Sequence, residues 1–145
     1  MSASGGAGPA ASPRYFEHDA DIGVIGSGKT LEESFESAAG ATFAIMVDPA
    51  TVEPAQSVSV EFEEADVEIA LVRWLNALVA TAREHGLALA RFWIERDGVR
   101  WRGGASGEPW RPGLERGVEV KGVILMMLSV VCAVEGWEAR CVVDV

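Results

Sequence analysis

Two stretches of the chain repeat apolar residues with the period of a helix. The first runs from Leu31 to about Val47 and stops before Pro49. The second follows Asp66, a residue type that caps helices, and ends near Gly86. Its apolar positions make one broad stripe, composed of Ala70, Leu71, Trp74, Leu75, Leu78 and Val79. The pattern therefore predicts two helices, each with one face against a core.

The other periodic segments have the composition and alternation of strands. They are residues 14–18, 22–25, 58–63, 89–95, 99–102, 114–134 and 139–145. Turns are expected at Asp97-Gly98 and Glu135-Gly136, and a loop is expected between the strands at 99–102 and 114–134. Two helices among many strands, without regular βαβ repetition, predict an α+β fold. We expect two layers, with both helices packed on a largely antiparallel or mixed sheet.

The length of 145 residues suits one domain with a sizeable core. Residues 14–145 are predicted to form that domain. Residues 1–13 are rich in Gly, Ala, Ser and Pro and are predicted to be a disordered tail. This tail has no basic start and no bulky apolar core, so it does not resemble a secretory signal. The apolar run Gly122 to Val134 is too short to cross a bilayer.

The formal net charge of −10 is unevenly distributed. No Lys or Arg occurs between Leu31 and Val72. The acids there are Glu32, Glu33, Glu36, Asp48, Glu53, Glu61, Glu63, Glu64, Asp66 and Glu68. Such a surface repels phosphates, which argues against direct, tight binding of RNA or DNA. It is either a solubilising surface or a face for a basic protein partner, and net charge alone favours neither.

Residues Gly23 to Thr30 match the phosphate-binding pattern G-x-x-x-x-G-K-[ST]. The segment before Gly23 is Glu-His-Asp-Ala-Asp-Ile, which is not the apolar strand that delivers such a loop. A helix cap explains the match differently, with Thr30 as the N-cap and Glu33 reaching back to the Thr30 N–H. We therefore expect an exposed Lys29 with no phosphate cradle, and a nucleotide-binding role is the weakest hypothesis.

A cluster of carboxylates is the strongest chemical feature. In an extended segment Glu17, Asp19 and Asp21 share one face, with neighbours about 7 Å apart, and they repel one another unless a cation is present. That cation is either a bound metal or Lys121. Asp144 ends an apolar strand beside the α-carboxylate of Val145. Oxygen ligands favour calcium or magnesium, unless these acids are simply exposed and never meet.

The remaining reactive residues give weaker signals. Cys132 and Cys141 lie in apolar strands without metal-type spacing, which predicts two buried, reduced thiols in a cytoplasmic protein. Three tryptophans, Trp74, Trp93 and Trp101, are expected in the core. No Ser-His-Asp or Cys-His arrangement can be assembled from the local sequence, so we expect no catalysis by this chain alone.

These residues together resemble the archease family. The segment Glu17 to Gly23 is similar to the family's Asp-His-Thr-Ala-Asp box and glycine turn, and Gly28 to Glu36 to the start of its first helix. The similarity continues in order to the end of the chain, through Met46-Val47-Asp48, Leu75 to Leu78, Gly107-Glu108, Glu119 to Val123 and Val143-Asp144-Val145.

The resemblance implies a small α+β accessory factor of an RtcB-type RNA ligase, an enzyme that joins RNA ends with GTP and manganese in tRNA splicing and RNA repair. It implies that the protein promotes guanylylation and multiple turnover of the ligase. It also implies a divalent metal, calcium in particular, held by Asp21, Asp144 and Val145, and a functional lysine at Lys121. Glu17 and Asp19 are possible further metal or charge groups.

The chain departs from the family pattern at two places. The first Asp of the box is Glu17 here and its Thr is Asp19, and Gly122 to Leu125 stand where the family usually has Ala-[IV]-Thr-Tyr. The second change removes two hydroxyls near the implied site. A second hypothesis therefore stays open, namely a metal-binding, chaperone-like module for another RNA-processing enzyme such as a tRNA methyltransferase.

Overall fold

A computed structural model describes residues 14–18 and 21–145. The predicted tail at 1–13 and Asp19 lie outside these residues. The helices are α1 (Leu31–Ala44), α2 (Val67–His85) and a short 3-10 helix (Pro49–Thr51). The strands are β1 (Arg14–His18), β2 (Asp21–Gly28), β3 (Gln56–Glu63), β4 (Leu87–Asp97), β5 (Arg100–Pro109), β6 (Gly122–Ala133) and β7 (Gly136–Asp144).

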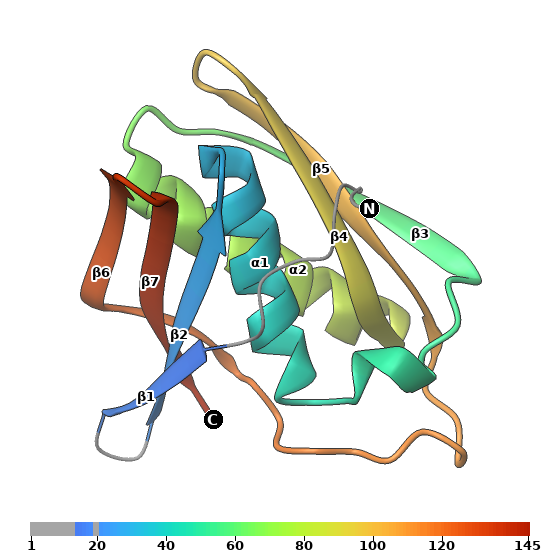
Figure 1. Ribbon diagram of the computed structural model, residues 1–145. Helices are drawn as coiled ribbons and strands as arrows, with labels where there is room; N and C mark the ends of the chain where they lie inside the picture. The colour runs from blue at the N-terminus through green and yellow to red at the C-terminus, as the bar shows by residue number, and fades with distance from the viewer. Residues whose placement is uncertain (1–13, 19–20) are drawn as a thin grey trace.

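The described strands form two antiparallel sheets with the two long helices between them (Figure 1). One sheet has the order β1-β2-β7-β6 and the other β3-β5-β4. Helix α1 packs against β2 and β7 on one side and β4 on the other, while α2 packs against β6 and the three-stranded sheet. The predicted α+β class and antiparallel pairing are confirmed. The strands divide between two sheets, so the layers are sheet, helices and sheet.

The core fills the space between α1, α2 and both sheets, and its largest aromatic side chains lie on the side of the three-stranded sheet. Trp74 of α2 is fully buried and its indole N–H donates to the carbonyl of Phe35 at 3.0 Å. The Phe35 ring stacks on Trp101 of β5 with 5.1 Å between ring centres. Both tryptophans thus combine large apolar area with a satisfied polar group. The core prediction is wrong for Trp93, whose residue surface is 43% exposed.

The glycines that match a phosphate-binding loop lie in strand β2. A Cβ on Gly26 would lie 2.3 Å from the backbone nitrogen of Ala38, and one on Gly28 would lie 2.4 Å from Cβ of Glu33. Glycine therefore lets α1 approach the strand closely, and β2 offers no loop for phosphate. Lys29 is exposed, as expected. The nucleotide-loop hypothesis is wrong for this structural reason.

Both helix starts are capped as the sequence predicts, with one difference. Thr30 Oγ1 accepts the Glu33 N–H at 3.1 Å, and Asp66 caps α2 through the N–H groups of Glu68 and Ile69. The Glu33 carboxylate accepts from the Lys29 N–H at 2.8 Å rather than from that of Thr30. Helix α2 ends at Gly86, which adopts the left-handed conformation with φ of 65°.

Two predicted strand boundaries are wrong. Strand β5 continues through Gly103, Gly104 and Gly107 to Pro109, where a loop was expected. A Cβ on Gly103 would lie 2.8 Å from the Trp74 ring, so this glycine makes room in a strand and marks no turn. The predicted long strand from Leu114 begins only at Gly122, because its first part forms a loop fastened to the end of α1.

Several acids of the 31–72 stretch join elements of the fold. The Glu36 carboxylate accepts the Ile94 N–H at 3.0 Å, linking α1 to β4, and burial raises the pKa of Glu36. Glu64 accepts from Arg73 Nε at 2.9 Å, and its carbonyl accepts the Trp101 indole N–H. Part of the acidic stretch is therefore structural. No helix of the described chain is long and apolar enough to cross a membrane.

The two cysteines differ in environment, so the prediction of two buried thiols is wrong for Cys132. Cys141 is buried, and desolvation raises its pKa to about 12, whereas Cys132 is exposed. In native protein at pH 8 we expect one thiol to react with 5,5′-dithiobis(2-nitrobenzoate), and two in guanidinium chloride. Cys132→Ser is expected to lose the native reaction. Rapid native reaction of Cys132→Ser would contradict the buried position of Cys141.

Candidate functional site

The ends of β2 and β7 bring two predicted site residues together. In the antiparallel ladder Ile22 pairs with Val143, so the next position along the ladder places Asp21 opposite Asp144. Paired residues of neighbouring strands project from the same face, with Cβ atoms about 5 Å apart. Both aspartates are half-buried. Two residues far apart in the sequence thus stand at neighbouring strand ends of the four-stranded sheet, at the end where the C terminus lies (Figure 1).

The backbone of Lys121 joins the same end of the sheet. Its N–H donates to the carbonyl of Asp144 at 2.8 Å, and the next residue, Gly122, pairs with Asp144 in the ladder. The Lys121 side chain is exposed. The backbone of Lys121 is therefore held at the same end of the sheet as Asp144, and its exposed side chain follows directly before Gly122. Val145 follows Asp144 directly and is half-buried.

Two residues of α2 hold this strand end in place, and the sequence reasoning missed both. Asn76 Oδ1 accepts the Val123 N–H at 2.9 Å. The Arg83 guanidinium lies 3.5 Å from the carbonyl of Val120 and 3.4 Å from that of Lys121. Asn76 had a usable signal, because it interrupts the apolar stripe of α2. No sequence signal indicated the role of Arg83, because its hydrogen-bond partners lie in the loop before β6.

The two aspartates carry the negative charge at this end of the sheet. Among the described residues, no Lys or Arg forms an ion pair with Asp21 or Asp144. No group of three acid, histidine or cysteine side chains within the described part of the chain is spaced to hold a metal. Nothing is described for the Glu17 side chain, and Asp19 lies outside the described residues, so the full ligand set stays a prediction.

An exposed apolar strip lies on the same strand as this site. Strand β6 is an edge strand, and its pairing with β7 breaks between Ile124 and Ser129. Leu125, Met126 and Met127 within the break are 66%, 46% and 51% exposed, and Met127 adopts the left-handed region with φ of 50°. Exposed apolar groups on an unpaired strand edge mark a surface for another molecule.

Residues 14–145 match the model of the archease protein family (MTH1598/TM1083). The chain belongs to the archease family. It is 36% identical to protein archease of Thermococcus kodakarensis over 136 residues, which cover 90% of this chain and 96% of that one. It is 37% identical to protein archease of Sulfolobus acidocaldarius over 100 residues, covering 68% of this chain and 72% of the relative.

Solved structures show the same fold. The solution structure of Methanobacterium thermoautotrophicum protein 1598 aligns with a TM-score of 0.83 and 32% identity, covering 92% of this chain and 98% of that one. The crystal structure of an archease described as a possible chaperone, TM1083 from Thermotoga maritima, aligns with a TM-score of 0.63 and 20% identity, covering 93% and 98%. The archease resemblance and the fold class drawn from the sequence are confirmed.

Proposed function

We propose that this archease is a cytoplasmic, non-catalytic accessory factor that activates an RtcB-type RNA ligase by promoting its guanylylation and turnover. The proposal is supported by the ends of β2 and β7, at Asp21 and Asp144, and by the backbone of Lys121, which lie at one end of the sheet on strands next to the exposed strip of β6. These residues can present charge or hold a cation. They include no activated nucleophile, so their chemistry suits action on a partner enzyme.

The residues at the sheet end fit a hard divalent cation. Asp21 and Asp144 are half-buried and follow the Ile22–Val143 pair at the ends of neighbouring strands, and oxygen donors of this kind suit calcium, with magnesium as the other candidate. Asp21, Asp144 and Val145 would hold it, with Glu17 and Asp19 as possible additional groups. When bound, the cation supplies positive charge that removes the repulsion between the carboxylates. The exposed Lys121 amine is then free to contact the partner.

The exposed strip is the part of the surface that we expect to touch the partner. Leu125, Met126 and Met127 carry no charge and stand next to the site along β6, so a protein bound over them covers the site residues too. Methionine adapts its shape to a partner surface. In such a complex the site faces the partner protein and not RNA. This agrees with a net charge of −10, which repels phosphates.

The direct test adds the purified protein to the RtcB-type ligase of the same organism, with RNA, GTP and manganese. We expect many ligations per ligase molecule instead of about one, with unchanged affinity of the ligase for RNA. Leu125→Ser is expected to weaken the complex about tenfold, as loss of a buried Leu predicts. Val99→Ser is the matched control, because Val99 is 46% exposed on a turn away from the strip.

Absence of both a complex and stimulation would contradict the proposal. In that case the second hypothesis, a metal-binding, chaperone-like module for another RNA-processing enzyme such as a tRNA methyltransferase, takes precedence. One observation favours this second hypothesis. The residues at the positions of the family's Thr and Tyr are Ile124 and Leu125, so this strip is apolar where hydroxyls are usual.

A further inference from the structure

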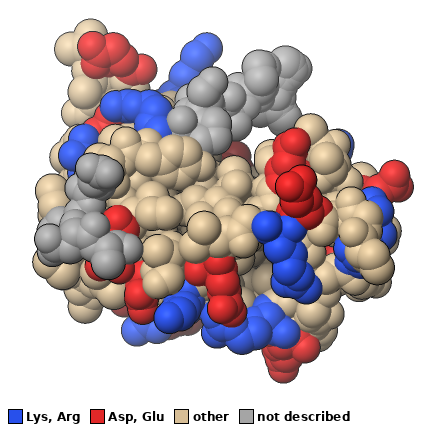
Figure 2. Space-filling view, turned by 90° about the horizontal axis from the view of Figure 1, so that it is seen from below, with Lys and Arg blue, Asp and Glu red and all other residues tan. Residues whose placement is uncertain are grey.

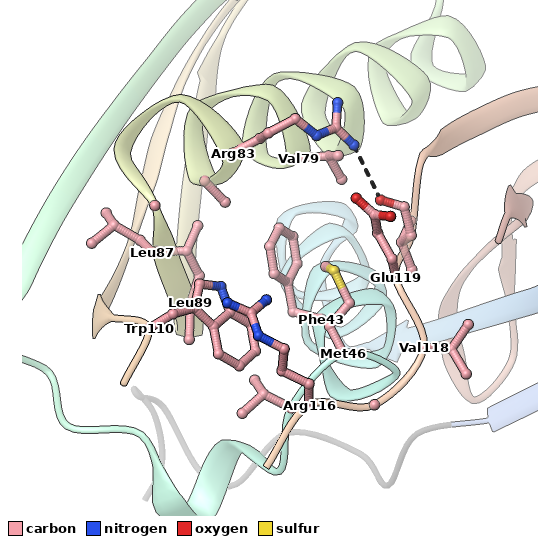
Figure 3. Close-up of a pocket in the computed structure, with 16 residues that line it drawn as sticks. Phe43, Met46, Val79, Arg83, Leu87, Leu89, Trp110, Arg116, Val118 and Glu119 are labelled. Carbon is pink, nitrogen blue, oxygen red and sulfur yellow. Dashed lines mark hydrogen bonds between the residues drawn. The ribbon is translucent and has the colours of Figure 1, made fainter. Parts of the chain in front are cut away.

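A cavity of about 470 Å³ opens between the ends of the two helices (Figure 3). Its wall is built from the last turns of α1 and α2, the start of β4 and the loop before β6. Most of the side chains that line it are apolar, among them Phe43, Met46, Leu89 and Trp110. Volumes of about 300–1,000 Å³ are typical of small-molecule sites.

The wall formed by the loop is fixed in position. The Gly117 N–H donates to the carbonyl of Met46 at 2.7 Å, and the Val118 N–H donates to that of Ile45 at 3.0 Å. A Cβ at Gly117 would lie 2.2 Å from the Ile45 carbonyl oxygen, so only glycine permits this approach. The cavity is therefore preformed, and a ligand would lose little free energy to ordering the protein.

The charged groups of the cavity favour an anion. Two of its charged side chains are cations, Arg83 and Arg116, against one carboxylate, Glu119. The Arg116 guanidinium lies over the Trp110 ring at 4.0 Å from its centre. Among the described residues neither arginine forms an ion pair, so both keep donors for a ligand. This excess of positive charge stands out in a chain of net charge −10.

We propose that the cavity binds a small amphipathic carboxylate. Its apolar body lies against Phe43, Met46 and Leu89, and its carboxylate accepts hydrogen bonds from Arg83 and Arg116. The planar fork of a guanidinium matches a carboxylate with two parallel hydrogen bonds. This site is separate from the Asp21 and Asp144 carboxylates, and its existence does not depend on the ligase.

The position of Arg83 connects the ligand to the neighbouring site. The same guanidinium lies within 3.5 Å of the carbonyls of Val120 and Lys121. A carboxylate that takes hydrogen bonds from Arg83 competes with these two carbonyls for its donors. Amide signals of Lys121 and Gly122 should therefore shift when the cavity fills, although neither residue lines it.

Calorimetry with decanoate, and with uncharged decanol at the same concentration, tests the proposal on the full chain. We expect decanoate to bind one site at least tenfold more tightly than decanol. Arg83→Gln and Arg116→Gln should each weaken decanoate binding about tenfold, the loss of one charge-assisted contact. Arg116 is exposed, so Arg116→Gln should melt like the parent protein, whereas Arg83→Gln also loses its contacts with the carbonyls of Val120 and Lys121. Leu125→Ser should bind decanoate unchanged.

Nuclear magnetic resonance locates the bound decanoate. The indole N–H signal of Trp110, assigned by its loss in Trp110→Phe, should shift on titration together with the amides of Lys121 and Gly122. No binding of millimolar decanoate would overturn the proposal. Equal binding of decanol, binding that is unaffected by both arginine changes, or binding lost in Leu125→Ser would overturn it as well, because the ligand would then lie elsewhere.

Discussion

We expect calcium to raise the melting temperature of the parent protein, and we expect replacement of Asp21 or Asp144 by Asn to remove that rise. A ligand that binds only the folded state at a hundredfold excess over its Kd adds about 2.7 kcal/mol to the free energy of unfolding. For a domain of this size that corresponds to a rise of roughly 10 °C. Each Asn keeps the shape of the side chain and removes the charge that holds the cation.

The same substitutions have a second expected effect without metal. Asp21 and Asp144 place two negative charges at neighbouring strand ends, so either Asn should raise the melting temperature in chelator slightly. Lys121→Ala is the matched control, because it changes charge at the same sheet end and should retain the calcium response. An undiminished response in Asp21→Asn and Asp144→Asn would show that no shared site exists. Replacing calcium by magnesium in the titration tells which cation stabilises more.

Gly26→Ala will strongly destabilise the fold, although Gly26 occupies a position of the nucleotide-type motif where any residue is allowed. The added Cβ would lie 2.3 Å from the Ala38 nitrogen and 2.4 Å from the Ser34 carbonyl oxygen, both backbone atoms of α1. The helix must move away from β2, which costs about 3 kcal/mol in overpacking. Urea denaturation measures this loss.

Gly40→Ala is the matched control for that prediction. Gly40 lies within α1, and a Cβ there would meet no heavy atom within 4 Å. Alanine at a helical position of this kind adds about 0.5–1 kcal/mol of stability. The two Gly→Ala changes should therefore have opposite signs. If Gly26→Ala is as stable as the parent, close packing does not explain the glycine, and a role in ligand binding has to be reconsidered.

The charge distribution of one face agrees with a partner-binding role for this end of the molecule. Figure 2 views the molecule from the end where the β5–β6 loop and the C terminus lie in Figure 1, and it shows an uncharged central surface bordered by acidic and basic side chains. Protein interfaces usually have few charged residues at their centre and a polar rim. Nucleic-acid interfaces are instead strongly basic.

The sequence was sufficient for the features that depend on local patterns. Thr30 and Asp66 as helix caps and the apolar stripe of α2 follow from residue type and spacing. The sequence predicted the placement of Asp21 near Asp144 only in part. The carboxylates suggested a shared cation, but the register that brings the two strand ends side by side is a long-range property. The archease resemblance supplied the pairing that spacing left open.

Other features depend on what packs against a residue. Gly103 and Gly104 suggested a loop, and only the ring of Trp74 and the backbone of the neighbouring strands show that they are strand positions. The segment before Gly122 is apolar enough for a strand, yet its hydrogen bonds go to the end of α1. The cavity was equally hidden, since Arg83 and Trp110 meet only through the fold.

The measurement that tests the central claim most directly counts ligations per ligase molecule with Asp144→Asn in place of the parent protein. If the sheet end acts on the ligase, Asp144→Asn should give no more ligation than the ligase alone. The assay temperature is kept below the melting temperature of Asp144→Asn, so that the variant is folded. Lys29→Ala, which changes the exposed lysine of the false nucleotide motif, should stimulate as fully as the parent. Full stimulation by Asp144→Asn would contradict the account.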